Sequence, residues 1–150
     1  MELILWRHAE AEDGFPDEAR PLTHKGQRQS EQMAHFLSGR LPQNTRVLVS
    51  PALRAQQTAS ALTGKFITAP NIGTQATPQT AIATAGWPGA ENPVLLVGHQ
   101  PWIGELAALL MTGQADCWSV KKGAVWWFSR RERDSRATLR LVMTPDQLSH

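Results

Sequence analysis

The sequence predicts an α/β fold, namely a three-layer α/β/α sandwich with a mixed, mostly parallel sheet. Three observations predict it. Short apolar runs alternate with helical segments over residues 2–111, which is the pattern of strands joined by crossover helices. The runs LILW and VLLV contain no polar residue, as expected of strands that are covered on both faces. The last two apolar runs, AVWWFS and TLRLVM, follow one another without a helix and predict a closing hairpin.

A polar loop separates the first predicted strand from the first predicted helix. Glu2–Trp6 is a run of strand-forming residues, and the loop AEAEDGFPDEARPLT follows it after two further residues. Thr23 has the character of a helix N-cap, and the helix runs from about His24 to Ser38. Gly39 ends this helix in the usual way.

The rest of the chain continues the alternation of strands and helices. RVLV at 46–49 is a second short strand, and Ser50-Pro51 opens a second helix that runs to about Leu62. The serine is expected to cap this helix, with the proline in its first turn. The remaining predicted elements are an edge strand at 66–68, a short helix in TPQTAIATAG, a buried strand Pro93–Gly98, a helix Trp102–Met111, and the hairpin strands Ala124–Ser129 and Thr138–Met143.

Length and composition indicate one domain over residues 1–150. The chain has 150 residues, of which 41% are hydrophobic, so it can bury about two-thirds of its unfolded surface. A net charge of +2 without clustered basic residues speaks against nucleic acid as a partner. A single cysteine, the absence of a signal peptide and the lack of an apolar run of ~18 residues predict a cytoplasmic protein without a membrane partner. The oligomeric state stays open.

Arginine and histidine residues follow the predicted parallel strands at the points where these strands end. Arg7 and His8 come directly after the first strand, and His99 follows the strand PVLLVG. Arg54 lies in the segment SPALRA, which comes after the strand RVLV and begins a helix. The carboxyl ends of parallel strands meet at one edge of a sheet. We therefore expect these four side chains to converge.

Two arginines and two histidines around one point favour phosphoryl chemistry. Arginine presents a planar fork of donors that matches phosphate oxygens, and the helix N-terminus near Arg54 adds to the attraction for an anion. A neutral histidine can attack phosphorus as a nucleophile, and transfer of a phosphoryl group depends mainly on positioning and charge stabilisation. The residues thus predict phosphoryl transfer through a phosphohistidine, with no metal and no cofactor.

Four segments of the sequence resemble the motifs of one known family. They are RHAEA (7–11), RPLTHKG (20–26), SPALRAQQTA (50–59) and VGHQP (97–101), in this order along the chain. They resemble the RHG, RPLTxxG, SPxxRAxQTA and GHxP segments of the histidine phosphatase superfamily, also called the phosphoglycerate mutase-like family. The short chain and the RPLT segment make it most similar to the SixA-type phosphohistidine phosphatases.

This resemblance implies a phosphoglycerate mutase-like fold, a phosphatase activity and a set of residue roles. His8 would be the nucleophile that takes the phosphoryl group, and Arg7 and Arg54 would bind its oxygens. His99 would complete the phosphate pocket. Arg20 would either bind phosphate or brace the neighbouring loop. The expected partner is a protein that carries phosphohistidine or a small phosphorylated substrate.

Two departures from the family pattern bear on the activity. Ala9 replaces the glycine of the RHG segment, which puts in doubt any backbone conformation that requires glycine. Residues 62–90 contain no Asp or Glu, although many family members carry an acid there. Imidazole is a better leaving group than an alkoxide, so the missing acid favours phosphohistidine as the substrate. Glu10, Glu12 and Asp13 in the first loop remain as possible proton donors.

Two groups of residues near the predicted site, a pair of tryptophans and a lysine segment, each allow two interpretations. The short connections favour an open site that accepts a phosphorylated protein. Trp87 and Trp102 either line this opening or pack at the sheet edge, with packing favoured. Lys121-Lys122-Gly123 either places a cation or a backbone N–H near the phosphate or simply begins a strand, with the second favoured.

Three other functions compete with a phosphohistidine phosphatase. A broad small-molecule phosphomonoesterase of the same fold would differ only in its substrate. A non-catalytic phosphoryl-binding module would bind phosphate without forming a covalent intermediate. A metal-dependent hydrolase is disfavoured because two arginines would repel a metal ion; its ligands would come from His8, Glu10, Asp13, His24 and His99.

Overall fold

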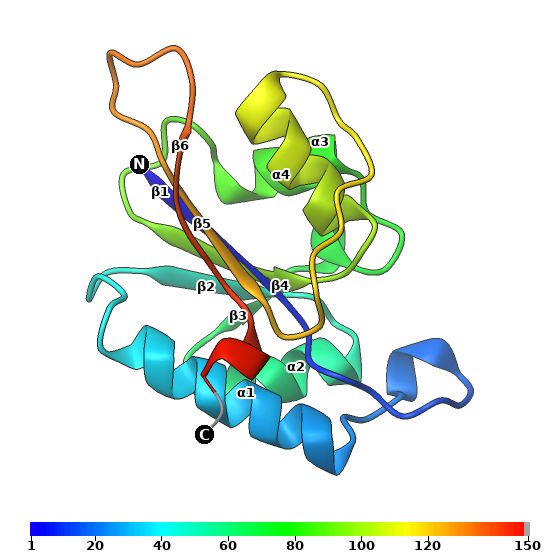
Figure 1. The fold of residues 1–150 in the computed structure, drawn as a ribbon. Coiled ribbons are helices and arrows are strands. Elements are labelled where there is room, and N and C mark those ends of the chain that lie inside the picture. The colour runs from blue at the N-terminus through cyan, green and yellow to red at the C-terminus, as the bar shows by residue number, and fades with distance from the viewer. Residues whose placement is uncertain (149–150) are drawn as a thin grey trace.

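The computed structural model describes residues 1–148 and contains one six-stranded sheet with the strand order β3-β2-β4-β1-β5-β6 (Figure 1). The strands β1, β2, β3 and β4 are parallel, whereas β5 is antiparallel to β1 and β6 is antiparallel to β5. This confirms the predicted fold class. The strands are β1 Glu2–Arg7, β2 Arg46–Val49, β3 Ile67–Thr68, β4 Val94–Gly98, β5 Val125–Ser129 and β6 Thr138–Met143.

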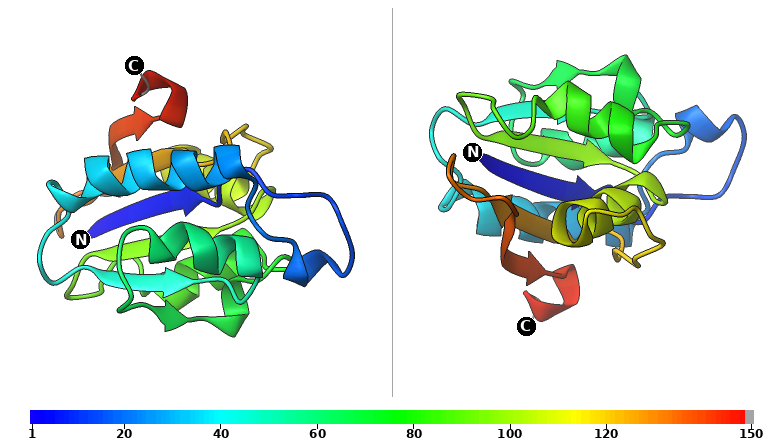
Figure 2. Two further views of the ribbon diagram at one scale, coloured as in Figure 1. Left: turned by 90° about the horizontal axis from the view of Figure 1, so that it is seen from below. Right: turned by 90° about the horizontal axis from the view of Figure 1, so that it is seen from above.

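Helices cover both faces of the sheet. Figure 2 shows α1 and α2 in front of the sheet in the view from below, and α3 and α4 in front of it in the view from above. The helices are α1 His24–Ser38, α2 Leu53–Ser60, α3 Pro78–Ala85 and α4 Trp102–Thr112, with short 3-10 helices η1 Asp17–Ala19, η2 Pro70–Ile72 and η3 Pro145–Gln147.

The unbroken apolar strands supply two cores, one on each face of the sheet. Successive side chains of a strand point to opposite faces. Leu3 and Leu5 therefore pack with α3 and α4, whereas Ile4 and Trp6 pack with α1 and α2. Burial on both faces explains why the central strands need no polar positions.

The starts of α1 and α2 differ in how well the sequence predicts them. α1 begins as expected, because the hydroxyl of Thr23 accepts a hydrogen bond from the Gly26 N–H at 2.9 Å. The prediction that Ser50 caps the second helix is wrong, since α2 begins at Leu53 and Ala52 occupies the cap position. The Ser50 hydroxyl instead contacts Nε2 of His99 at 2.6 Å. A partner from a neighbouring strand thus competes with the local capping role.

The remaining elements agree with the prediction to within about two residues at their ends. Thr77 caps α3 by accepting from the Thr80 N–H, and Gly86 ends it in the left-handed conformation. Among the helices of residues 1–148, none has both the length and the apolar character needed to cross a bilayer.

The parallel register sets three polar residues side by side at one edge of the sheet. Arg7 of β1 is paired with Gly98 of β4, and Val49 of β2 is paired with Val97. The His8 N–H donates to the Gly98 carbonyl and the Ser50 N–H donates to the Val97 carbonyl, both at 3.0 Å. His8, Ser50 and His99 therefore leave three adjacent strands at the same level.

Candidate active site

A cavity of about 270 Å³ lies at the C-terminal edge of the parallel strands. All five side chains that the sequence predicts as site residues line it, namely Arg7, His8, Arg20, Arg54 and His99. Residues from four separate segments of the chain thus meet in one place. The parallel order of β2, β4 and β1 brings about this convergence.

The imidazole of His8 is held in one tautomer. Its Nδ1 lies 2.8 Å from the Ala9 carbonyl oxygen. Because a carbonyl oxygen only accepts, Nδ1 carries the proton and Nε2 carries a lone pair. Nε2 accepts a hydrogen bond from Nε of Arg54 at 3.3 Å. The basic nitrogen of His8 therefore lies beside a guanidinium.

His8 is neutral at ordinary pH. Burial lowers the pKa of His8 to about 4; the hydrogen bond to Ala9 opposes this, and the charges of Arg54 and Arg7 add to it. The side chain is only 7% exposed. A neutral imidazole with a lone pair in a cationic cavity has the properties of a nucleophile toward phosphorus.

Ala9 takes the place of the family's glycine without backbone strain. No residue other than glycine has a positive φ among residues 1–148, so Ala9 adopts a conformation open to any residue. Its methyl group is fully buried, and its N–H donates to Oγ1 of Thr58 at 3.1 Å. The doubt that the sequence raised at this position therefore has no basis in the backbone geometry.

His99 lines the cavity and has one buried ring nitrogen without a hydrogen-bond partner among the described residues. Its Nε2 contacts the Ser50 hydroxyl, whereas its Nδ1 is buried without a hydrogen-bond partner among the described residues. Burial lowers the pKa of His99 to about 3, and its proximity to His8 and Arg54 contributes. The two imidazole rings are 5.1 Å apart. An orphaned polar atom of this kind fits a ligand oxygen.

A carboxylate that the sequence analysis missed joins two of the arginines. Asp17 accepts from Nη2 of Arg54 at 3.2 Å and from Nε of Arg20 at 3.1 Å, and its carbonyl accepts from Nη1 of Arg54 at 2.8 Å. Arg20 also donates to the Glu12 carbonyl at 3.0 Å. In this structure Arg20 braces the first loop, which is one of its two predicted roles. The spacing of Asp17 three residues before Arg20 was the available signal.

Unlike Arg54 and Arg20, Arg7 makes no hydrogen bond or ion pair with Asp17. Its Nη1 donates to the Val120 carbonyl at 2.8 Å, and its Nε is buried without a partner among the described residues. Burial lowers the pKa of Arg7, and the neighbouring charge of Arg54 adds to this effect. Arg7 therefore lines the cavity and carries one unsatisfied N–H in the protein interior.

Of the three predicted proton donors, only Asp13 lines the cavity. The Glu10 carboxylate accepts from the Thr23 hydroxyl at 2.8 Å, outside the lining. Glu12 contacts Arg20 through its carbonyl only. Among residues 1–148, no three His, Cys, Asp or Glu side chains gather in a way that could hold a metal ion.

The structure shows which of the tryptophans and lysines near the site line the cavity. Trp102 is fully buried and donates from Nε1 to the Gly73 carbonyl at 3.2 Å, so it packs and does not line the opening. Trp87 packs against the same core, beside a separate cavity. The favoured packing interpretation is thus confirmed for both. Lys122, by contrast, lines the cavity, as the less favoured interpretation of its segment expects.

Comparisons with known proteins agree with this geometry. The model of the histidine phosphatase superfamily (branch 1) matches residues 3–72. The phosphohistidine phosphatase SixA of Escherichia coli (strain K12) is 34% identical over 124 residues, which cover 76% of each chain. An uncharacterized protein of Picosynechococcus sp. is 34% identical over 129 residues, covering 76% of this chain and 75% of that one. A solved structure of the protein histidine phosphatase SixA complexed with tungstate superposes with a TM-score of 0.81 at 28% identity, covering 99% of this chain and 100% of that chain.

Proposed function

The chain belongs to branch 1 of the histidine phosphatase superfamily, and from this premise we propose that it is a metal-independent phosphatase that removes the phosphoryl group from phosphohistidine on a protein. The observation that carries the proposal is the neutral His8, whose basic Nε2 lies 3.3 Å from Nε of Arg54 in a cationic cavity. The E. coli relative is named a phosphohistidine phosphatase, which supports the same substrate class.

In the proposed first step, Nε2 of His8 attacks phosphorus with its lone pair. A bond forms between Nε2 and phosphorus, and the bond between phosphorus and the substrate's imidazole nitrogen breaks. The substrate's imidazole takes a proton from solvent on its other ring nitrogen, keeps the electron pair of the broken bond and leaves as neutral imidazole. Arg7 and Arg54 would neutralise the phosphoryl oxygens, and His99, which lines the same cavity, would contact one of them.

In the second step, water attacks the phosphorus of phosphorylated His8. Inorganic phosphate leaves, and Nε2 regains its lone pair. The hydrogen bond from Nδ1 to the Ala9 carbonyl keeps the ring in position through both steps. This cycle needs no metal ion, and it begins and ends with the same tautomer.

The size of the cavity supports a protein as the substrate. Its volume of about 270 Å³ is below the range of roughly 300–1,000 Å³ that is typical of small-molecule sites. The cavity is thus at the small end of such sites and can hold a phosphoryl group with only a small part of a large substrate. The absence of an acid over residues 62–90 further supports an imidazole leaving group.

The test measures phosphate release from a radiolabelled phosphohistidine protein in the presence of a chelator, with an alkaline quench. We expect wild-type protein and His35→Ala to release phosphate and His8→Ala to release none. His35 is exposed on α1, so it is a matched control for loss of an imidazole. No release by wild type would contradict the proposed activity and would leave a non-catalytic phosphoryl-binding module.

A second candidate is a broad small-molecule phosphomonoesterase. The observation that favours it is the carboxyl of Asp13 in the cavity lining, since a carboxyl group can protonate an alkoxide leaving group. The rates of hydrolysis of alkyl phosphates and of phosphohistidine distinguish the two candidate functions. Hydrolysis of alkyl phosphates at a rate similar to phosphohistidine, with a large loss in Asp13→Asn, would favour the second candidate.

A further inference from the structure

We propose that Lys122 binds a phosphoryl oxygen of the substrate, as a phosphate-binding cation outside the four sequence motifs. The inference rests on the proposed function, because it concerns the same cavity. Lys122 lines this cavity together with Arg7, Arg54 and His8. None of the motifs at 7–11, 20–26, 50–59 and 97–101 contains it.

The backbone that carries Lys122 is fixed to the strand that carries the nucleophile. The Gly123 N–H donates to the carbonyls of both Arg7 and His8 at 3.1 Å. On the other side of Lys122, the Val120 carbonyl accepts from Nη1 of Arg7 at 2.8 Å. Nε1 of Trp6 donates to the Gly123 carbonyl at 3.1 Å. Hydrogen bonds on both sides of Lys122 therefore fix its position relative to His8.

Among the cations of the cavity, Lys122 is the one left without a partner. Arg54 donates to His8 and Asp17, Arg20 donates to Asp17 and Glu12, and Arg7 donates to Val120. Lys122 is exposed and makes no hydrogen bond or ion pair with any residue of the described chain. Its ammonium group can therefore turn to an incoming anion without breaking an existing interaction.

The charges around the cavity explain why a further cation at Lys122 would favour phosphate binding. Four cations line the cavity, whereas Asp13 in the lining and Asp17, paired with two of the arginines, supply two negative charges. His8 and His99 are neutral, because burial lowers the pKa of both. The surplus of two positive charges matches the charge of roughly −1.5 to −2 on a phosphoryl group near pH 7. Without Lys122 only one positive charge remains.

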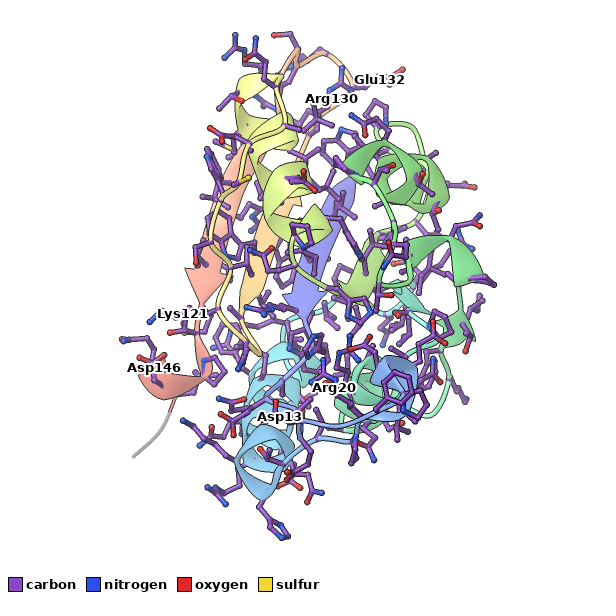
Figure 3. All side chains as sticks on the ribbon, turned by 90° about the vertical axis from the view of Figure 1, so that its right-hand side faces the viewer. Asp13, Arg20, Lys121, Arg130, Glu132 and Asp146 are labelled. Carbon is purple, nitrogen blue, oxygen red and sulfur yellow. The ribbon has the colours of Figure 1, made fainter. Side chains whose placement is uncertain are left out.

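The neighbouring Lys121 provides a matched control. Figure 3 shows Lys121 beside Asp146 at one side of the molecule, away from Asp13 and Arg20. A hydrogen bond from Thr144 lowers the pKa of Asp146, and the charge of Lys121 contributes. Lys121 thus acts electrostatically on Asp146 in the C-terminal segment, and it does not line the cavity. Two adjacent lysines with the same exposure differ in their access to the site.

The experiment measures the affinity for inorganic phosphate by titration calorimetry at pH 7.5, in a chelator and at low salt. We expect Lys122→Met to raise the Kd for inorganic phosphate about tenfold, in keeping with loss of one charge-assisted contact. Lys122→Arg should stay within about threefold of wild type, because it keeps the charge. Lys121→Met should change the Kd less than about twofold, because its charge is screened over distance.

The proposal is overturned if Lys122→Met behaves like Lys121→Met, or if wild-type protein does not bind millimolar inorganic phosphate. The binding measurement needs no turnover, so it separates this inference from the proposed function. A protein that hydrolyses no phosphohistidine but loses phosphate affinity in Lys122→Met refutes the function and supports Lys122. If wild-type protein hydrolyses phosphohistidine and Lys122→Met binds inorganic phosphate as well as wild type, the function is supported and the role of Lys122 is refuted. Because Lys122 is exposed, thermal unfolding should be the same in all variants.

Discussion

At the scale of single residues, Asp17 acts on the site through two arginines, Arg54 and Arg20, although it has no assigned role. Burial alone would raise its pKa, but hydrogen bonds from Arg54 and Arg20, together with their charges, lower the pKa of its carboxyl. Asp17 is therefore ionised near neutral pH. It aligns Arg54 through a carboxylate and a carbonyl contact, and it also cancels one positive charge in the site.

Replacing Asp17 by Asn should separate these two effects. Asn keeps the shape of the side chain and an oxygen acceptor, but it removes the negative charge. We expect inorganic phosphate to bind about three- to tenfold more tightly, since one more positive charge acts on the anion. Turnover should fall several-fold, because Arg54 loses its charged support next to Nε2 of His8. Calorimetry and steady-state kinetics on the same preparation measure both quantities.

A weaker affinity for inorganic phosphate in Asp17→Asn would contradict this account, because it would mean that the carboxylate aids anion binding. Glu18→Gln is the control. Glu18 lies in the same 3-10 helix and has no hydrogen bond or ion pair among residues 1–148. Loss of its charge should change phosphate affinity less than about twofold.

The residues of the site differ in how far the sequence could predict them. Arg7, His8 and His99 are predictable because each directly follows or ends a parallel strand, and the sheet then fixes their neighbours. The spacing of Asp17 before Arg20 hints at their ion pair, but its contact with Arg54 was not predictable, because it depends on the path of the loop between β1 and α1. The hydrogen bond from His8 to Ala9 is not predictable either, since it depends on a ring orientation.

At the scale of secondary-structure elements, the first loop is fixed by its contact with the N-terminus of α1. The Thr23 N–H donates to the Glu10 carbonyl at 3.0 Å, and the Glu10 N–H donates to the side chain of Gln29 at 3.0 Å. Gly26 is buried in the first turn of α1, and a Cβ at this position would overlap the Glu10 carbonyl. The glycine thus lets the loop cross the helix closely enough to reach the cavity.

Gly26→Ala should therefore destabilise the fold, although alanine is the better helix former. We expect the free energy of unfolding to fall by about 1–3 kcal/mol, because the loop must move away from α1. Urea unfolding measures this change. Gly39→Ala is the matched control, since a Cβ there meets nothing within 4 Å and its φ of −88° is open to alanine. It should be neutral or more stable by about 0.4–1 kcal/mol. Equal stabilities of the two variants would contradict the role given to Gly26.

The elements were predictable where one local signal was sufficient. β2 and α1 have the predicted bounds, because an apolar run and a capped amphipathic segment have no competing pattern. The start of α2 was not predictable, because the Ser50 hydroxyl contacts both the Ala52 N–H before the helix and Nε2 of His99. That contact joins β2 and β4, and a local pattern carries no information about it.

At the scale of the whole molecule, the site places two neutral imidazoles at the C-terminal edge of the parallel strands. His8 and His99 are 7% and 2% exposed, and burial is the largest cause of their low pKa values. An unfolded chain takes up protons on histidine below a pKa of about 6.5. The folded protein takes up these protons only near pH 4 for His8 and near pH 3 for His99. The arrangement of the two neutral histidines is thus coupled to the stability of the entire fold.

The direction of the pH effect follows from proton linkage. Between about pH 6.5 and 4 the unfolded state binds more protons than the folded state, so stability falls as the pH falls. The carboxyl of Asp17 acts outside this window, because its pKa is lowered from 3.8. The free energy of unfolding should therefore be constant above about pH 7.5. It should decrease by about 4 kcal/mol between pH 7.5 and 5, with equal contributions from the two histidines.

Urea unfolding at pH 7.5 and pH 5 in phosphate-free buffer measures this decrease, since bound phosphate would add its own stabilisation. In His8→Gln the decrease should be about half as large, because only His99 then remains neutral and buried. His35→Gln should leave it unchanged, because this side chain is exposed on α1. A decrease below about 1 kcal/mol in wild type would mean that the folded protein accepts these protons readily. His8 would then be largely cationic in mild acid, and the lone pair that the proposed attack on phosphorus requires would be missing.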